Sequence, residues 1–132
     1  MVVKTIMIPI VETIKGITSI DRAASIMKRL GVKVLPVVDH GQVTGILTEE
    51  DIVHKSTAKG HHPTRTQVMD VMTVGEITCW EDQTPQEVAQ IMEQMKKRHL
   101  IVLDRKKQPV GIVSRDVLSK KVRDLSASEA SS

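Results

Sequence analysis

Residues 45–51 read GILTEED, and 66 positions later residues 111–117 read GIVSRDV. Each stretch has a glycine, two aliphatic residues and a hydroxyl residue, with a carboxylate close behind. A Ser or Thr that begins a helix, with an acidic or amide residue three positions later, is typical of a capping box. The first stretch fits with Thr48 and Asp51, whereas the second keeps Ser114 but has Val117 in place of the acid. The motif therefore predicts two equivalent strand-to-helix turns, one of them without its carboxylate.

The similarity between the two stretches extends over nearly the whole chain. At an offset of 65 positions, RAASIM (22–27) aligns with EVAQIM (87–92), and VLPVVD (34–39) aligns with HLIVLD (99–104). One extra residue after Asp104 changes the offset to 66. A repeat of about 65 residues buries too little surface to be robust alone, so we expect the two repeats to pack against each other.

Each repeat is predicted to fold as β-α-β-β-α, which places the chain in the α/β (α+β) class. A short strand is expected near residues 11–14 and again near 76–80. The helix that follows begins at Ser19 in the first repeat and at Thr84 in the second, where TPQE reads as a capping box with proline at the first helical position. Two strands joined by a turn, and a shorter second helix, complete each repeat. The predicted divisions are a first repeat at 1–64, a second at 65–125 and a disordered tail at 126–132, with a polar linker at 55–66.

The composition limits the possible functions. The chain has 132 residues, no Phe or Tyr and a single Trp, so its core must be aliphatic. The net charge is only +3, but ten basic residues lie between positions 96 and 123 against two acids. Such a run is typical of a solvated face, or of a site for an anion such as phosphate. Nucleic-acid binding through residues 96–123 stays an alternative, although aromatic stacking platforms for single strands are lacking.

Catalytic and metal chemistry are not indicated. The lone Cys79 excludes an internal disulfide and a thiolate metal cluster. The five histidines have no metal-ligand spacing, and no nucleophile is placed with a base. No apolar run is long enough for a membrane span or a signal peptide. We therefore expect a cytoplasmic protein that is not an enzyme and carries no metal or catalytic cofactor.

The two turns have a structural and a functional interpretation. Helix capping alone contributes about 0.5–2 kcal/mol, which is reason enough for Thr48 and Ser114. A helix N-terminus also favours anions, and a nearby carboxylate accepts two hydrogen bonds from the vicinal diol of a ribose. Because the motif occurs twice at the same place in a repeated unit, a sugar phosphate is the ligand that it favours.

The sequence resembles a tandem pair of CBS domains, the cystathionine-β-synthase-type repeat also called a Bateman module. The resemblance covers about residues 3–124 and rests on VMDVMT at 68–73, the two A-x-x-M helices, PVVD at 36–39 and the opening GILTEED. It implies two repeats related by a pseudo-twofold axis, with clefts between them that bind AMP, ADP, ATP or S-adenosylmethionine. It further implies association into a homodimer and regulation of a partner protein.

The resemblance also implies roles for residues that match the family. Thr48 and Asp51 match the hydroxyl and the ribose-binding carboxylate, and Ser114 matches the hydroxyl of the second repeat. Asp116 would replace the acid missing at Val117 only if the start of its helix were shifted, or wound differently, by one residue.

The family further implies a phosphate-directed basic residue and a pocket for the base. Arg98 and His99 match the basic position in the second repeat, whereas Lys33 and Val34 occupy it in the first. The pocket for the base would be lined by Thr13, Ile14, Thr78 and Cys79, with Val34, Leu35 and Pro36 on the facing side.

Each repeat departs from the family pattern in a different way. The first has the ribose carboxylate without the adjacent arginine or histidine, and the second has the basic residues without the carboxylate. We predict one stronger site centred on Asp51 and a second that is weak or absent. The predicted function is a regulatory module that binds an adenine nucleotide or S-adenosylmethionine; the alternative is an interaction module with vestigial pockets.

Overall fold

The structure, a computed structural model, describes residues 1–10, 12–75 and 77–131, with side chains described as far as residue 127. The chain divides into two compact units, which we call the central unit (Val11–Gly75) and the terminal unit (Met1–Ile10 with Glu76–Ser132). The terminal unit therefore contains both ends of the chain. The fold is mixed α/β, and the β-α-β-β-α order predicted from the sequence recurs in both units.

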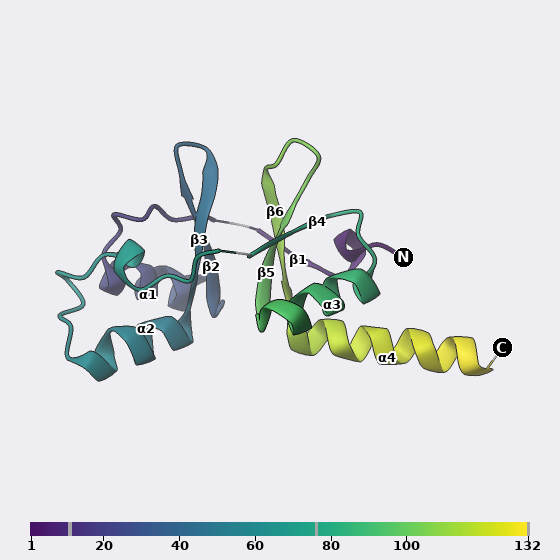
Figure 1. The fold of residues 1–132 in the computed structure, drawn as a ribbon. Coiled ribbons are helices and arrows are strands. Elements are labelled where there is room, and N and C mark those ends of the chain that lie inside the picture. The colour runs from purple at the N-terminus through teal and green to yellow at the C-terminus, as the bar shows by residue number, and fades with distance from the viewer. Residues whose placement is uncertain (11, 76, 132) are drawn as a thin grey trace. The chain divides into compact units, whose positions relative to one another are not determined.

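The central unit is built around a β-hairpin covered by two helices. Strands β2 (Val34–Asp39) and β3 (Gln42–Thr48) pair antiparallel, and helices α1 (Ile20–Leu30) and α2 (Glu49–Lys55) flank them (Figure 1). Single bridges extend the hairpin on both sides: Ile14 pairs parallel with Val37, and Thr73 pairs antiparallel with Ile46. Two 3₁₀ helices, Thr57–Lys59 and Val68–Asp70, follow α2.

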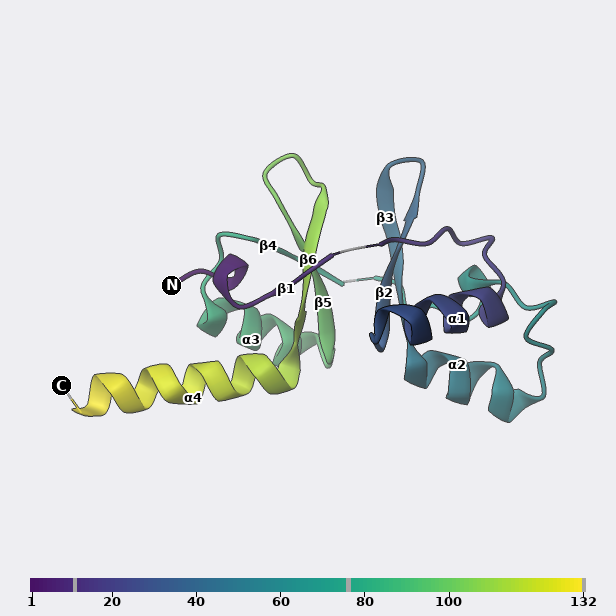
Figure 2. The same ribbon diagram turned by 180° about the vertical axis from the view of Figure 1, so that it is seen from behind.

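The terminal unit repeats this plan with a four-stranded sheet in the order β1-β6-β5-β4. Strand β4 runs parallel to β5, and the other pairs are antiparallel (Figure 2). Its elements are a 3₁₀ helix (Val3–Thr5), β1 (Ile8–Pro9), β4 (Thr78–Trp80), α3 (Pro85–Met95), β5 (His99–Leu103), β6 (Pro109–Ser114) and α4 (Arg115–Ser131).

The segment at the start of each repeat packs into the unit that holds the other repeat. Val3 N–H donates to the carbonyl of Gln83 at 2.7 Å, and 65 positions later Val68 N–H donates to that of Thr18, also at 2.7 Å. The sequence repeats predicted at 1–64 and 65–125 are therefore not the same divisions as the two compact units. Periodicity detects a repeat, but it carries no information on which hairpin a repeat's first segment joins.

Three further segments can be compared with their expectations. The strand expected at 11–14 is reduced to the bridge at Ile14, and Val11 lies outside the described residues. The strand expected at 76–80 is confirmed as β4, with Glu76 outside the described residues. The tail expected from 126 onward is helical as far as Ser131, because α4 continues without interruption.

The first helix of each repeat begins where the sequence predicts, but the caps differ. Ser19 precedes α1 and makes no side-chain cap; instead, Ile20 and Asp21 N–H donate to the carbonyls of Thr66 and Pro63 at 3.0 and 3.2 Å. Thr84 caps α3 by accepting from Glu87 N–H at 3.1 Å. The linker that carries Pro63 therefore satisfies the N–H groups at the start of α1, so this helix end is not a free anion site.

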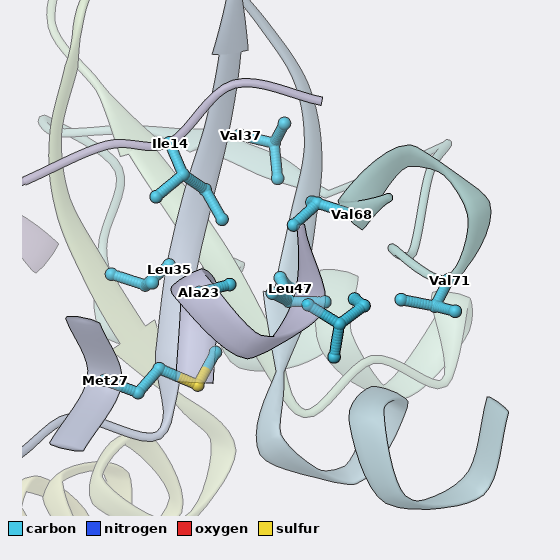
Figure 3. Packing of buried hydrophobic residues seen from close by; sticks show 9 residues of the cluster. Ile14, Ala23, Met27, Leu35, Val37, Leu47, Val68 and Val71 are labelled. Carbon is cyan, nitrogen blue, oxygen red and sulfur yellow. The ribbon is translucent and has the colours of Figure 1, made fainter. Parts of the chain in front are cut away.

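Each unit has its own aliphatic core, as the absence of Phe and Tyr predicts. In the central unit, residues of α1, β2 and β3 meet the 3₁₀ segment at 68–70 (Figure 3). This core consists of Ile14, Ile20, Ala23, Met27, Leu35, Val37, Leu47, Val68 and Val71. The core of the terminal unit consists of Val3, Cys79, Val88, Met92, Leu100, Val102, Val113 and Leu118.

The glycine of the opening motif is needed for close packing. A Cβ built on Gly45 would lie 2.4 Å from Sδ of Met72, and one built on Gly111 would lie 2.3 Å from Sδ of Met7. Both distances are far below van der Waals contact. In each unit, a methionine from the first segment of the other repeat therefore lies directly over the glycine, in the space that a larger side chain would fill. The glycine that opens each motif thus leaves room for the methionine of a segment that comes from the start of the other repeat.

Candidate functional site

The turn at the start of α2 holds Asp51 in a complete capping box. Asp51 N–H donates to Thr48 Oγ1 at 3.0 Å, and Thr48 N–H donates to Asp51 Oδ2 at 3.1 Å. The predicted capping box is therefore confirmed, with Asp51 7% exposed. A buried carboxylate that accepts a backbone hydrogen bond from Thr48 and sits on a capped helix start keeps a single orientation, which a directional binding group requires.

Two more side chains contact the same carboxylate. Thr73 Oγ1 lies 3.2 Å from each oxygen of Asp51, and Lys55 Nζ lies 3.0 Å from Oδ1. Lys55 also donates to Thr73 Oγ1 at 3.4 Å. Thr73 reaches Asp51 because its backbone pairs with Ile46 of β3, through two hydrogen bonds of 2.9 Å. Thr48, Asp51, Lys55 and Thr73 form the polar group that we call the Asp51 cluster.

Sequence reasoning identified Thr48 and Asp51 but missed Lys55 and Thr73. A signal for Thr73 was present in the repeat. Thr73 aligns with Ile8, and Asp51 aligns with Val117, so both members of this hydrogen-bonded pair are replaced by apolar residues in the other repeat. Two replacements that occur together indicate two side chains that interact.

The helix N-terminus itself offers little to an anion. Glu49 N–H donates to the carbonyl of Lys33 at 2.9 Å, and Asp51 N–H is taken by Thr48. Helix α2 is also only seven residues long. Two N–H groups of the first helical turn are therefore already bonded within the protein, and the carboxylate is the distinctive feature.

The residues expected to line the base pocket of the first repeat all lie in the central unit. Val34 is 8% exposed and pairs with Thr48, and Pro36 is also buried and pairs with Ile46. Ile14 is buried and its N–H donates to the carbonyl of Pro36 at 3.0 Å, whereas Thr13 is exposed. The hairpin thus places Val34 directly beside Thr48, and Ile14 on the far side of β2.

A hollow of about 520 Å³ opens in the central unit between residues 12–19 and α1. Thr13 and Ile14 line it, so it includes part of the expected base pocket but none of the Asp51 cluster. Its remaining lining residues are Glu12, Lys15, Ile17, Thr18, Ser19, Arg22 and Ile26.

Asp39, the last residue of the PVVD stretch, holds the middle of residues 12–19 through Gly16, a contact that the sequence did not predict. It accepts hydrogen bonds from Thr44 Oγ1 at 2.7 Å and from Gly16 N–H at 3.1 Å. The Thr44 hydroxyl, followed by the Gly16 N–H, lowers the pKa of Asp39 below its ordinary value of 3.8.

The lowered pKa of Asp39 predicts a small, acid-sensitive contribution to stability. A carboxyl group whose pKa is lower in the folded state stabilises the protein above its unfolded pKa, and this contribution is lost as the pH falls through the folded pKa. We expect Asp39→Asn to be less stable than the wild type at neutral pH, and the difference to shrink below pH 3.8. Urea unfolding of both proteins between pH 7 and pH 2.5 measures this difference in unfolding free energy. A difference that stays constant over this range would contradict the lowered pKa of Asp39.

The turn of the terminal unit keeps the cap and lacks the carboxylate. Val117 N–H donates to Ser114 Oγ at 3.3 Å, so Val117 holds the position of Asp51 without any shift of the helix start. Asp116 is exposed one position earlier and does not replace the missing acid, which corrects its expected role. Ile8 and Val117 are 59% and 48% exposed, so two apolar side chains stand where the central unit has Thr73 and Asp51.

The other expected site residues of the second repeat all lie in the terminal unit. Arg98 is exposed and its carbonyl accepts from Arg115 N–H at 2.8 Å, the counterpart of the Lys33 bond in the central unit. His99 is half-buried and pairs with Ser114. These two residues and Ser114 therefore lie at one end of the β5–β6 pair, and a phosphate site there stays a prediction.

Thr78 and Cys79 lie on β4, opposite Ile101 and Val102 of β5. Cys79 is 3% exposed, and burial raises the pKa of its thiol to about 12. The thiol therefore stays protonated and packs as a small apolar group. Within the described residues, no group of three or more His, Cys, Asp or Glu side chains is placed to hold a metal ion. No helix in the described part of the chain is long and apolar enough to cross a membrane.

Comparison with known proteins identifies relatives of both repeats. The family model described as CBS domain matches residues 3–57 and 68–124. The CBS domain-containing protein YhcV of Bacillus subtilis is 34% identical over 112 residues, which are 85% of this chain and 79% of YhcV. A solved structure of the CBS domain pair of protein MJ0100, in complex with 5′-methylthioadenosine and S-adenosyl-L-methionine, is 30% identical with a TM-score of 0.80. The match covers 94% of this chain and 97% of that one.

A relative that is an enzyme shares only a small part of its length with this chain. Inosine-5′-monophosphate dehydrogenase of Korarchaeum cryptofilum is 29% identical over 104 residues, which are 79% of this chain but 21% of the enzyme. The similarity is therefore confined to one portion of that protein, and its catalytic activity is not carried over.

Proposed function

Because the chain belongs to the CBS domain family, as a pair of such domains, we propose that it is a non-catalytic regulatory module that binds an adenosine-containing small molecule. The ligand is held at the Asp51 cluster of the central unit, and its presence is read by a partner protein. The observation that carries this proposal is the buried carboxylate of Asp51, oriented by Thr48 at the start of α2.

The chemistry of Asp51 suits a ribose. Its carboxylate is an acceptor of fixed direction, and a carboxylate in such a position binds the vicinal hydroxyls of a nucleotide ribose. The apolar Val34 lies beside Thr48 on the paired strand, where the base is expected. The ligands in the MJ0100 structure, 5′-methylthioadenosine and S-adenosyl-L-methionine, both carry adenine on a ribose with a free diol.

The terminal unit is proposed to bind such a ligand weakly or not at all. It has Ser114 and the basic residues Arg98 and His99, but Val117 supplies no acceptor for the diol. A ligand there would have to leave two ribose hydroxyls without a carboxylate partner, which costs roughly 1–3 kcal/mol for each unmade bond. One ligand per chain is therefore the expected stoichiometry.

Ligand-induced stabilisation tests the proposal. A ligand present at 100 times its Kd is expected to add about 2.7 kcal/mol to the unfolding free energy, which raises Tm by several degrees. The panel is 5′-methylthioadenosine, S-adenosyl-L-methionine, AMP, ADP and ATP, with guanosine monophosphate as the control for the base. No shift with any adenosine compound would overturn the proposed function and favour an interaction module with vestigial pockets.

Nucleic-acid binding gains no support from where the basic residues lie. The stretch at 96–123 spreads over the turn after α3, the β5–β6 turn and α4, and that β-turn lies at the opposite end of the sheet from α3 and α4 (Figures 1 and 2). Arg105 is also paired with Asp82. A homodimer stays a prediction, which sedimentation velocity tests directly.

A further inference from the structure

Lys55 occupies part of the surface of Asp51 that a ribose needs. Its Nζ lies 3.0 Å from Asp51 Oδ1 and 3.4 Å from Thr73 Oγ1, and its side chain is 43% exposed. Lys55 is the last residue of α2, one turn beyond Asp51, so the two side chains lie on the same face of the helix.

The carboxylate of Asp51 cannot accept a diol while all its present donors stay in place. An ionised carboxylate has about four lone-pair positions. Thr48 N–H and Lys55 Nζ each use one, and the Thr73 hydroxyl is shared between both oxygens. Two ribose hydroxyls need two positions, so at least one present donor must move.

Lys55 is the donor that can move. The Thr48 N–H is part of the backbone at the start of α2, and Thr73 is held by its two backbone bonds to Ile46. Lys55 reaches Asp51 through a flexible four-carbon stem, and its side chain is 43% exposed to solvent. Because the lysine of this ion pair is partly exposed to solvent, water can take over its contacts and its displacement does not prevent ligand binding.

The other repeat provides a matched reference for this lysine. Lys121 stands 66 positions after Lys55, at the same place in α4, where Val117 replaces Asp51. Among the described residues, Lys121 forms no ion pair. The chain thus has the same lysine once beside a carboxylate and once without one.

We propose that Lys55 is the resident counter-cation of Asp51 and that it selects the charge of the ligand. The ribose diol takes the place of the ammonium on Asp51, and the displaced ammonium remains next to the bound ribose. There it attracts a ligand with an anionic 5′ group and repels a cationic one. This inference rests on the proposed ribose site and specifies the ligand as a nucleoside with a 5′-phosphate.

Three adenosine compounds differ in the charge of the 5′ group. AMP carries a phosphate, 5′-methylthioadenosine is neutral, and S-adenosyl-L-methionine has a sulfonium ion at this position. A unit charge a few ångströms away in a solvent-accessible site changes the affinity by roughly five- to tenfold. The wild type is therefore expected to bind AMP more tightly than 5′-methylthioadenosine, and S-adenosyl-L-methionine most weakly.

Calorimetric titration of these compounds into four proteins tests the inference: the wild type, Lys55→Met, Lys55→Arg and Lys121→Met. Lys55→Met keeps the length of the stem and removes the charge. It is expected to bind 5′-methylthioadenosine about threefold more tightly, because no cation has to be displaced, and to lose roughly five- to tenfold of the preference for AMP. Lys55→Arg is expected to keep the preference for AMP, and Lys121→Met to behave as the wild type.

The outcomes separate this inference from the proposed function. If the wild type binds the compounds and Lys55→Met shows the same affinities and the same order, the role of Lys55 is wrong and the ribose site stands. An equal change in Lys121→Met would also overturn it, because the effect would then be one of general charge. If neither the wild type nor Lys55→Met binds any of the three compounds, the proposed function fails and this inference fails with it.

Discussion

Asp51→Asn is expected to weaken the binding of 5′-methylthioadenosine by about a hundredfold. The substitution keeps the size of the side chain but removes the charge that strengthens two hydrogen bonds from the ribose diol. Hydrogen bonds to a charged group contribute about 1.5–3 kcal/mol each, and a hundredfold change corresponds to about 2.7 kcal/mol. Isothermal titration calorimetry measures the affinity directly.

Two controls make this result specific. Asp116→Asn, in the equivalent turn of the terminal unit, is expected to leave the affinity unchanged, because Asp116 lies outside the position that Val117 holds. The double variant Ile8→Thr, Val117→Asp places the missing pair in the terminal unit, and we expect the stoichiometry to rise from one ligand per chain to two. Loss of binding in Asp116→Asn, or normal binding in Asp51→Asn, would place the site elsewhere. The unfolding midpoint of each variant shows that it is folded at the temperature of the titration.

Val3→Asp is expected to unfold the terminal unit, although Val3 lies at the start of the first repeat. Val3 is fully buried in the core of that unit, and a charged group there has no partner. Such a substitution costs roughly 4 kcal/mol or more, which is a large part of the stability of a small protein. The equivalent change, Val68→Asp, is expected to unfold the central unit instead, because Val68 is fully buried in the central core.

Hydrogen exchange with mass spectrometry measures the two effects separately. Val3→Asp should increase exchange in peptides from residues 77–125 and leave residues 12–75 protected, and Val68→Asp should do the reverse. Thr5→Asp, at an exposed position of the same segment, serves as the control. The opposite pattern, with Val3→Asp opening residues 12–64, would mean that each repeat keeps its own first segment.

The fold could be predicted largely because its signals are local and occur twice. The capping residues Thr48, Ser114 and Thr84 mark helix starts whichever unit they belong to, and the strands of each hairpin follow from β-branched runs. Local signals could not predict that the first segment of each repeat packs into the unit that holds the other repeat. Met7 and Met72 are the same residue type, and each packs on a glycine, Gly111 and Gly45. The sequence is therefore compatible with either methionine on either glycine.

The site was predicted less completely than the fold. Thr48 and Asp51 stand next to each other in one motif, so their hydrogen bonds could be expected from spacing alone. Thr73 is 22 residues from Asp51 and reaches it only through pairing with Ile46, which is a tertiary contact. Lys55 was visible at helical spacing, but an acid and a lysine four residues apart are common on helix surfaces, and nothing local shows that this acid is buried.

Because residues 1–10 pack into the terminal unit, the fold also determines the order in which the chain can fold on the ribosome. The central unit is complete once residue 75 has emerged, whereas β1 must wait for β6, which lies about 100 residues later. At roughly 5–20 residues per second, this delay is on the order of 5–20 s. Early in this interval β3 has been synthesised but the segment with Met72 and Thr73 has not. The surface over Gly45, which Met72 later covers, is then open to the methionine at position 7.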